Sequence, residues 1–387
     1  MLIVPIGEAR EGMKLAVPVS HPENPSQVLL RQGYALDKLV IARMRSIGIS
    51  FIYVEYPALD SLDRHLAVQL SPERQAIYRD IKQSITQVQR QTHVRIPYDD
   101  YCKTTRDMVT ILLTQGQNPI YLDQMSRQGG EVVAHAAAVA HLSLLLGLKL
   151  EAYLISQRTR LPANRAKDIT NLGVAGMLHD LGISRLPEAL QGFCETNPPK
   201  DSAELEEWEN HARIGYDLIH NDVESTAAAA VYQHHQHFDG SGFPSLKLAG
   251  GSESAMDSQR IHVFARIILC ANLFDRLASP PDSRIHRSNH QVLEIMQKRY
   301  AGWYDPEVFR VLQIIAPPFP PGCRVDLTDG TRAIVTDINA ATPMQPIVRR
   351  LASDDWELVG DPIDLSLPDA PQIRPPSTAQ PSEPAMA

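Results

Sequence analysis

Short apolar runs separated by turns open the chain. Three of these runs predict strands, at residues 3–4, 29–30 and 51–54. Residues 36–47 carry apolar side chains at helical spacing, and Gly48 follows as a typical helix end. Pro57 and the polar residues after it end this pattern. Residues 1–60 are therefore predicted to form a small α/β module.

Helical spacing dominates the middle of the chain. Residues 61–122 predict a helical connector or the first helices of the next domain, and residues 123–316 predict a helical domain broken by Gly and Pro turns. The longest apolar stretch, 132–148, contains His135 and His141. Because it is too short and too polar for a membrane span, it is predicted to be a buried helix.

The end of the chain changes character again. A proline-rich hinge at 317–322 precedes three predicted strands, at 324–327, 332–337 and 347–349. Residues 317–367 are predicted to form a small β module, and residues 368–387 a disordered tail. The predicted fold class is mainly α: an all-helical domain with a small N-terminal α/β module and a short C-terminal β segment.

Composition narrows the class of protein. The formal net charge of −8 argues against a nucleic-acid-binding surface and against an anchor on anionic membranes. The 4 cysteines form no CxxC pair and suit a reducing compartment. The N-terminal sequence MLIVPIGEAREG lacks the pattern of a signal peptide. A cytoplasmic protein without a membrane span is therefore expected.

Two pairs of polar residues interrupt apolar helical segments. His179 and Asp180 are adjacent at the end of the run 172–178, where burying them is costly unless they are paired or bind a metal. Glu131 and His135 are spaced i, i+4 and share one face of a predicted helix. Taken singly, a hydrogen-bonded helix cap and a satisfied core histidine would explain each pair more simply.

The densest cluster follows the apolar segment 227–232 and reads HHQHFDGSGFP over residues 234–244. Successive helical residues point about 100° apart, so His234 and His235 can reach different parts of one cluster. The Asp-Gly-Ser-Gly turn then ends the helix. A solvated histidine patch is the simpler alternative, and the other clusters argue against it.

Imidazoles and carboxylates thus lie on separate apolar helices. His211 and Asn272 add two more candidates, although neither residue alone would indicate a metal site. Mixed nitrogen and oxygen ligands suit borderline metals such as iron, manganese, zinc or nickel. Asp180 could bridge two ions with its two oxygens, and a two-metal site stabilises the attacking and leaving oxygens of a phosphodiester.

The order of these residues resembles the HD-GYP family, a branch of the HD phosphohydrolase superfamily, over residues 123–315. The family motifs HHExxDGxGYP, HD-x-G-K and His-x-x-x-Gly are similar to residues 234–244, 179–183 and 211–215. His135 is similar to the upstream family histidine, and Glu131 to the extra ligand of trinuclear members.

The resemblance implies an all-helical HD-type metal-binding domain with two or three divalent ions, iron or manganese, and hydrolysis of cyclic di-GMP to the linear dinucleotide or GMP. The implied metal ligands are Glu131, His135, His179, Asp180, His211, His234, His235 and Asn272. His179 and Asp180 are the implied catalytic pair. The implied substrate contacts are Arg284, Arg287, Asp239, Gly240 and Gly242.

The chain departs from the family pattern at positions that bear on activity. Ile183 stands where a lysine is usual, Gln236 replaces a glutamate, and Asn272 replaces the last aspartate ligand. Phe243 stands where the pattern has tyrosine. The first three changes remove a cation near the phosphate, a carboxylate that could orient a histidine, and an anionic metal ligand.

Three functions follow from this pattern. The first is an active cyclic di-GMP phosphodiesterase. The second is a catalytically weak protein that binds cyclic di-GMP or a protein partner and signals through the N-terminal module. The third is a phosphohydrolase of another nucleotide. Expected partners are cyclic di-GMP and diguanylate cyclase-type or other signalling proteins, and a homodimer is allowed.

Overall fold

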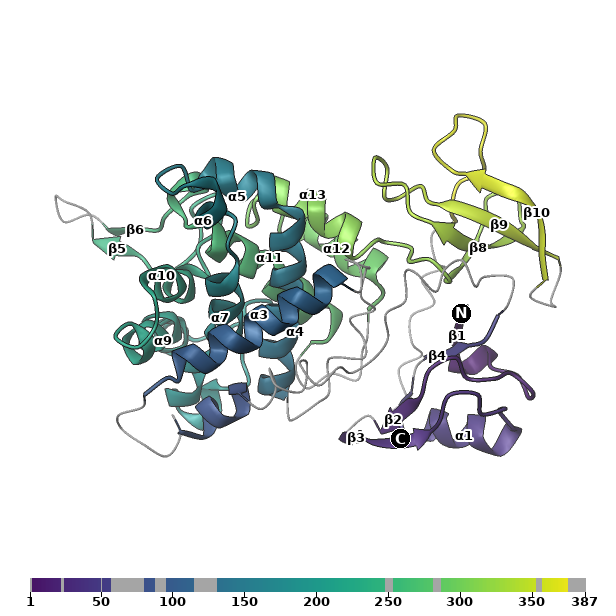
Figure 1. Cartoon of the computed structure of the whole chain (residues 1–387), viewed down its shortest axis with the longest axis horizontal. Coiled ribbons are helices and arrows are strands. Elements are labelled where there is room, and N and C mark those ends of the chain that lie inside the picture. The colour runs from purple at the N-terminus through teal and green to yellow at the C-terminus, as the bar shows by residue number, and fades with distance from the viewer. Residues whose placement is uncertain are drawn as a thin grey trace.

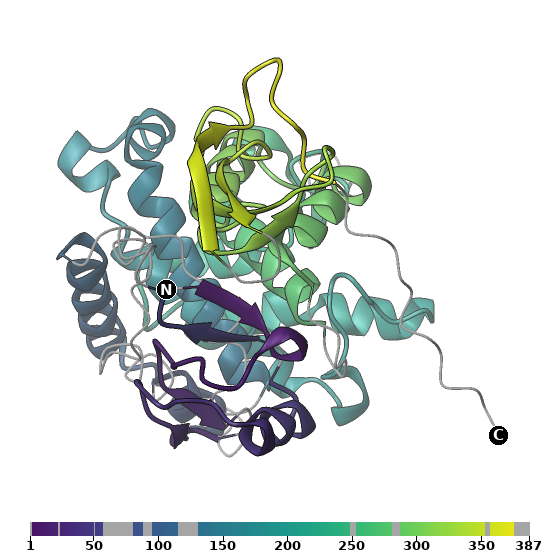
Figure 2. The same ribbon diagram turned by 90° about the vertical axis from the view of Figure 1, so that its right-hand side faces the viewer.

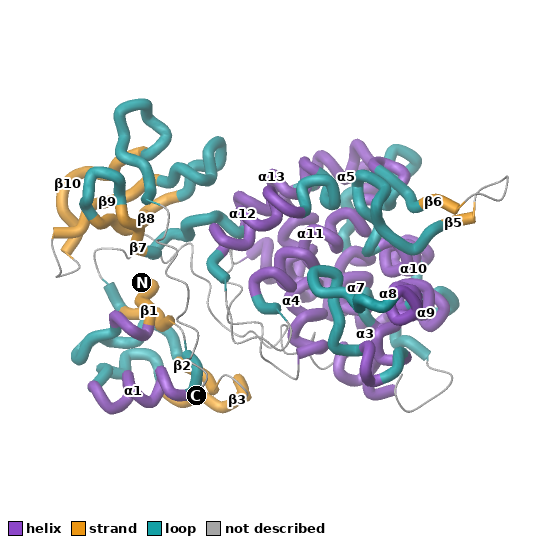
Figure 3. Tube along the Cα trace, turned by 180° about the vertical axis from the view of Figure 1, so that it is seen from behind, coloured by secondary structure: helices purple, strands orange, loops and turns teal. Residues whose placement is uncertain are grey.

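The computed structural model describes residues 2–21, 24–49, 51–56, 80–87, 95–114, 131–247, 253–280, 287–352 and 357–374. Figure 1 shows the helices gathered in one body, with the N-terminal and C-terminal strands beside it. Figure 3, coloured by secondary structure, shows the same separation from behind. The fold class expected from the sequence, mainly α with small α/β and β parts, is confirmed.

The N-terminal module pairs its first and last strands. Its elements are β1 (Leu2–Pro5), η1 (Ile6–Glu8), β2 (Val19–His21), β3 (Asn24–Leu30), α1 (Lys38–Ser46) and β4 (Phe51–Val54). β1 runs antiparallel to β4, and β2 pairs with β3 in a second sheet. α1 begins at Asp37, whose side chain accepts the Val40 N–H at 2.7 Å. The helix therefore lies within the range that apolar spacing predicts.

The helical body holds most of the buried residues. Its helices are α3 (Tyr98–Thr114), α4 (Glu131–Lys149), α5 (Glu151–Gln157), α6 (Ala163–Ala166), α7 (Thr170–Leu178), α8 (Ser202–Glu209), α9 (His211–Ile219), α10 (Ser225–Gln233), α11 (Val263–Ala278), α12 (Asn289–Arg299) and α13 (Pro306–Ile315). Shorter elements join them: η4 (Leu181–Arg185), η5 (Glu188–Leu190), β5 (Leu246–Lys247), β6 (Glu253–Ser254) and η6 (Ser258–Arg260). α3, expected in the connector, packs against α7 and shares its core.

α4 lies at the centre of this body, in contact with α7, α11 and α13. Within α4, the window Val132–Lys149 is long and apolar enough to span a membrane, and 83% of that window is buried. Its alanines, valines and leucines pack against the neighbouring helices. The prediction that this stretch is a buried core helix is confirmed.

The C-terminal module is one four-stranded antiparallel sheet in the order β10-β9-β8-β7. Its strands are β7 (Arg324–Asp326), β8 (Arg332–Asp337), β9 (Ile347–Ala352) and β10 (Glu357–Asp364). β10 was not predicted, because Gly360 and Pro362 break the strand pattern and a bulge interrupts its pairing between Val359 and Ile363. The boundary of the expected disordered tail is also wrong: Ile373 bridges to Leu327, whereas residues 375–387 lie outside the described part.

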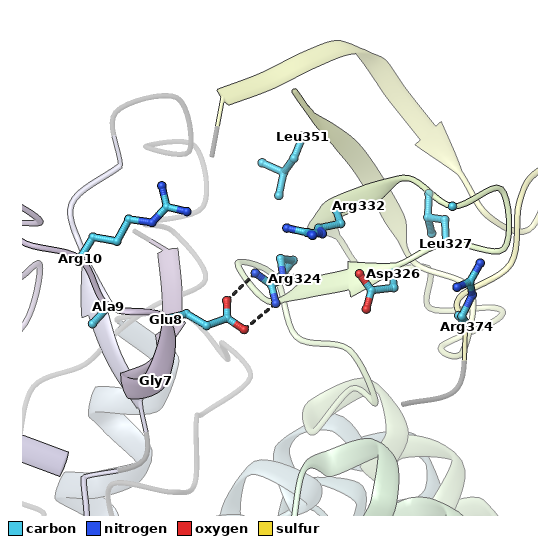
Figure 4. A pocket seen from close by; sticks show the side chains of 11 residues that line it. Gly7, Glu8, Ala9, Arg10, Arg324, Asp326, Leu327, Arg332, Leu351 and Arg374 are labelled. Carbon is cyan, nitrogen blue, oxygen red and sulfur yellow. Dashed lines mark hydrogen bonds and ion pairs between the residues drawn. The ribbon is translucent and has the colours of Figure 1, made fainter. Parts of the chain in front are cut away.

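The N-terminal and C-terminal modules share one core. Ile334 of β8 is fully buried in a cluster with the residues of β1, β4 and α1, and Leu351 and Leu358 pack on it. Glu8 and Arg324 form an ion pair across the contact, with Oε1 and Nη2 2.6 Å apart. Figure 4 shows this pair at one side of a cavity of about 690 Å³ that also faces Arg10, Arg332 and Arg374. Figure 2 shows the two modules stacked in a second view.

Candidate metal centre

The predicted histidines come together at the ends of helices. His179 ends α7 and Asp180 begins η4, so the chain turns sharply between them. His211 is the first residue of α9, and His234 ends α10. His135 lies in the second turn of α4. Five histidines and one aspartate from four helices, widely separated in sequence, therefore meet in the interior of the helical body.

Asp180 lies between two groups of histidines. Its Oδ2 is 3.5 Å from His135 Nε2 and 3.4 Å from His179 Nε2. Its Oδ1 is 3.5 Å from His234 Nε2 and 3.8 Å from His211 Nε2. The potential ligand atoms fall into two sets, His135–His179–Asp180 and Asp180–His211–His234–His235. We call these the Oδ2 half and the Oδ1 half of the centre.

Each of the five histidines has its Nδ1 next to an acceptor. The carbonyl oxygens of Gly176, Trp208 and Val231 lie 2.9, 2.6 and 2.6 Å from the Nδ1 atoms of His179, His211 and His234. Carboxylates serve the other two: Asp275 Oδ2 is 2.6 Å from His135 Nδ1, and Glu195 Oε1 is 3.1 Å from His235 Nδ1. Since these oxygens can only accept, the hydrogen-bonded Nδ1 atoms of His135, His179, His211 and His234 carry the proton, and their Nε2 atoms keep a lone pair.

The Nε2 atoms face one another in pairs. His211 and His235 approach to 3.0 Å, and His135 and His179 to 3.3 Å. Burial lowers the pKa of His135 and of His234 to about 4, and lowers that of His211 well below its usual value. Facing lone pairs on neutral imidazoles repel unless a cation lies between them. The donor set therefore fits divalent metal ions.

The carboxylate at the centre stays ionised. Burial alone would raise the pKa of Asp180, but its polar neighbours His179, His234 and His135 outweigh this effect. The pKa is therefore held well below its usual value. An anion here has the two oxygens needed to face both halves of the centre.

Glu195, in the loop before α8, was not predicted. Its side chain is buried, with Oε1 3.1 Å from His235 Nδ1 and 2.8 Å from His237 Nε2. Burial would raise the pKa of Glu195, but His235 and His237 lower it. The carboxylate that orients a histidine thus comes from this loop. Gln236 instead braces the chain: it donates to the Pro244 carbonyl and accepts from Met256 N–H, both at 2.6 Å.

Glycines allow the helix ends to approach. A Cβ on Gly182 would lie 2.0 Å from the His211 carbonyl oxygen, and one on Gly242 would lie 2.1 Å from the His235 carbonyl oxygen. Any side chain at either position would push these segments apart. Both glycines are in the motifs that the sequence singles out, and their role here is close packing around the ligands.

A buried neutral amide and a positive charge lie one turn apart on α11, the helix that supplies a neighbour of the Oδ2 half. Asn272 is buried on α11, and its Oδ1 has no hydrogen-bond partner. Ile183 is buried in η4 and apolar, as expected. The cation beside the aspartate is instead Arg276 of α11, whose Nη2 lies 3.1 Å from Asp180 Oδ2. Sequence reasoning missed Arg276, because nothing in its spacing points across the fold to Asp180.

Two of the expected substrate contacts, Arg287 and Asp239, make hydrogen bonds to neighbouring parts of the chain. Arg287 donates from Nη1 to the Leu277 carbonyl at 2.7 Å, at the end of α11. Asp239 accepts the Ser241 hydroxyl at 2.6 Å within its own turn, and Gly240 supplies a positive φ of 82° there. Arg284 and the side chain of Glu131 lie outside the described residues.

Phe243 packs on His235 and His211. Its ring stacks on His235, with centroids 4.4 Å apart, and meets Trp208 at 5.5 Å. Trp303 stacks in the same way on His237, at 3.9 Å. These aromatic contacts and Glu195 together hold His235 and His237 in place.

Comparisons with known proteins match the part of the chain that contains most of these residues. The HD domain family model matches residues 137–308. The chain is 23% identical over 218 residues to a cyclic di-GMP phosphodiesterase of Pseudomonas aeruginosa, covering 56% of this chain and 46% of that protein. It is 27% identical over 157 residues to the cyclic di-GMP phosphodiesterase response regulator RpfG of Xanthomonas campestris pv. campestris, covering 40% of this chain and 35% of the relative.

The chain thus spans less than half the length of these curated relatives. A solved HDGYP protein of Bdellovibrio bacteriovorus is similar to it at 15% identity with a TM-score of 0.44, covering 81% of this chain and 98% of that one. The matched domain and the curated relatives confirm the resemblance inferred from the motifs. Residues 137–308 thus match the HD domain family, and the chain is similar to proteins of its HD-GYP branch.

Proposed function

We propose that the chain is a metal-dependent phosphodiesterase that hydrolyses cyclic di-GMP. One observation carries the proposal: the Nε2 atoms of four buried histidines lie within 3.8 Å of the two oxygens of Asp180, and His235 adds a fifth potential ligand. The two curated relatives are both named as cyclic di-GMP phosphodiesterases, which supports this substrate.

The residues that would hold divalent ions are the histidines and aspartate of the two halves, and iron or manganese suits this mixed donor set. Bound there, such ions would act as Lewis acids and lower the pKa of a water molecule. The chain itself supplies the fixed geometry. Asp275 and Glu195 hold the protons of His135 and His235, so that the ligand lone pairs do not need to reorient.

A weakly active, cyclic di-GMP-binding protein is a second candidate. The neutral Asn272 and the Arg276–Asp180 ion pair favour it, because each lowers the affinity of the Oδ2 half for a cation. In either case we propose that residues 1–60 and 317–367 form the regulatory part. We also propose a cytoplasmic protein that acts with other signalling proteins, with a homodimer as one arrangement.

The test is hydrolysis of cyclic di-GMP by the purified chain, loaded with ferrous iron or manganese under anaerobic conditions. Chromatography of the products separates the linear dinucleotide from GMP. The proposal expects product from the wild type and none from Asp180→Asn. Binding of cyclic di-GMP by calorimetry without product would favour the second candidate. Neither binding nor product would overturn both.

A further inference from the structure

Arg276 lies in the metal centre rather than at its edge. It follows Asn272 by four residues on α11, so both side chains lie on the same face of that helix. Arg276 is 8% exposed, and Nη2 of its guanidinium lies 3.1 Å from Asp180 Oδ2. An arginine stays charged at any pH at which the protein is folded. A fixed positive charge is thus built into the Oδ2 half.

The two oxygens of Asp180 therefore have different neighbours. Oδ1 faces the imidazoles of His211 and His234. Oδ2 is hydrogen-bonded to Arg276. A metal ion bound by Oδ2, His135 and His179 would have to lie next to the guanidinium and repel it. An ion bound by Oδ1, His211, His234 and His235 would face no such neighbour on that oxygen.

Charge balance points the same way. The described carboxylates at the centre are Asp180, Asp275 and Glu195, each within 3.5 Å of a ligand histidine. Arg276 and one divalent ion would neutralise these three negative charges. A second divalent ion would leave an excess positive charge in a buried site, which is costly. Asn272, with an amide in place of a carboxylate, adds no negative charge to offset it.

We propose that Arg276 takes the place of one metal ion. The resting centre then holds a single divalent ion, in the Oδ1 half, and the guanidinium neutralises Asp180 on the other side. This inference rests on the metal-dependent function proposed above, but not on the identity of the substrate. It makes the number of ions, rather than the rate of hydrolysis, the property that Arg276 controls.

The experiment counts ions in the full chain without substrate. Wild type, Arg276→Met and Arg276→Lys are equilibrated with excess manganese, freed of loosely bound metal and analysed by mass spectrometry. Electron paramagnetic resonance distinguishes isolated manganese from a coupled pair. We expect one isolated ion in wild type and in Arg276→Lys, and close to two, with the coupled signal, in Arg276→Met.

Arg266→Met is the matched control. Arg266 is also a buried arginine on α11 that pairs with an aspartate, Asp305, but that aspartate is not a candidate ligand. This variant should keep one ion, whatever the loss of the buried pair does to its melting temperature. Two ions in wild type would overturn the inference even if Arg276→Met does not fold. An equal count in wild type and a folded Arg276→Met would also overturn it.

The outcomes separate the two proposals. One ion in wild type without hydrolysis of cyclic di-GMP would reject the proposed substrate and leave the role of Arg276 standing. Hydrolysis of cyclic di-GMP by a wild-type chain that holds two ions would support the proposed substrate and reject the role of Arg276.

Discussion

The two halves of the centre are built from the same kinds of residue but differ in charge. In the Oδ1 half, helix-end carbonyls and Glu195 hold the histidines, and Asp180 faces neutral imidazoles. In the Oδ2 half, Asp275 holds His135, and Arg276 already neutralises the aspartate. Two unit charges of like sign 4 Å apart repel by about 4 kcal/mol at an effective dielectric constant of 20, and a divalent ion by about twice that. The number of potential metal ligands in the centre therefore does not give the number of ions that it binds.

Removing the shared anion should abolish the difference between the halves. Asp180→Asn keeps the size of the side chain but leaves both sets of histidines without their carboxylate and removes one negative charge that Arg276 contacts. We expect metal content near zero, hydrolysis lower by ~10³-fold or more, and a fall in melting temperature because a buried ion pair is broken. Metal analysis, product chromatography and thermal melting measure these. Wild-type metal content in a folded Asp180→Asn would contradict the assignment of this residue.

Glu195→Gln should affect the Oδ1 half alone. An amide can still contact His235 but cannot hold its Nδ1 proton as a carboxylate does, so metal affinity should fall by about 10–100-fold. Calorimetric titration with manganese measures this change in metal affinity. Glu188→Gln, an exposed glutamate of the nearby η5, is the control and should bind as the wild type does. Equal affinity in the two variants would show that Glu195 is not part of the support.

Asn272→Asp sharpens the comparison from the other side. It adds a negative charge to the Oδ2 half with little change in size, so affinity for a second ion should rise, by roughly 10-fold. The effect should be larger when Arg276→Met is present. Melting with and without manganese separates this from a structural role. A lower melting temperature that manganese does not restore would mean that the buried carboxylate lacks a cation to pair with.

The smallest expected effect is on the acid stability of the metal-free protein. The pKa values of His135 and His234 are lowered to about 4 in the folded state, against about 6.5 when unfolded. The unfolded chain therefore binds more protons in this window, and stability is lost as pH falls from about 6.5 towards 4. In the presence of a chelator, the melting temperature should fall by about 5 °C or more from pH 7 to pH 5.

The charge of Arg276 should also make the pKa of His135 differ in its response from the pKa of His234. Burial first, and then the charge of Arg276, lowers the pKa of His135, whereas His235 is the next contributor for His234. Arg276→Met should therefore raise the pKa of His135 and leave that of His234 nearly unchanged. Histidine resonances followed by NMR through the titration provide the check. Equal movement of both would mean that the two halves do not differ in charge as described.

Sequence reasoning found the residues that local motifs carry. His179, Asp180, His234 and His235 were predicted because they lie in recognisable runs, and His135 and His211 because their order along the chain matches the family motifs. The buried α4 was predicted because its apolar residues are continuous. Glu195 could not be predicted, since it is a single acid in an irregular loop and acts only through contacts with His235 and His237. Arg276 is 96 residues from Asp180, and its contact depends on how α11 packs against α7.

The outer modules show the same limit. The strands at 324–326 and 332–337 were predicted from their apolar runs, whereas β10 contains a glycine and a proline that hide it. Nothing in the separate patterns indicated that the first and last modules would share a core. That contact depends on Ile334, which points to the N-terminal module and away from its own sheet's cluster.

Joining the first and last modules has a consequence for the helical body between them. While the two modules stay associated through Ile334 and the Glu8–Arg324 pair, the helical body is a loop with its ends held together. Closing a loop of this length costs an unfolded chain roughly 5 kcal/mol of conformational freedom. Because that cost falls on the unfolded chain, the association stabilises the helical body as a cross-link would, without touching a single ligand of the centre.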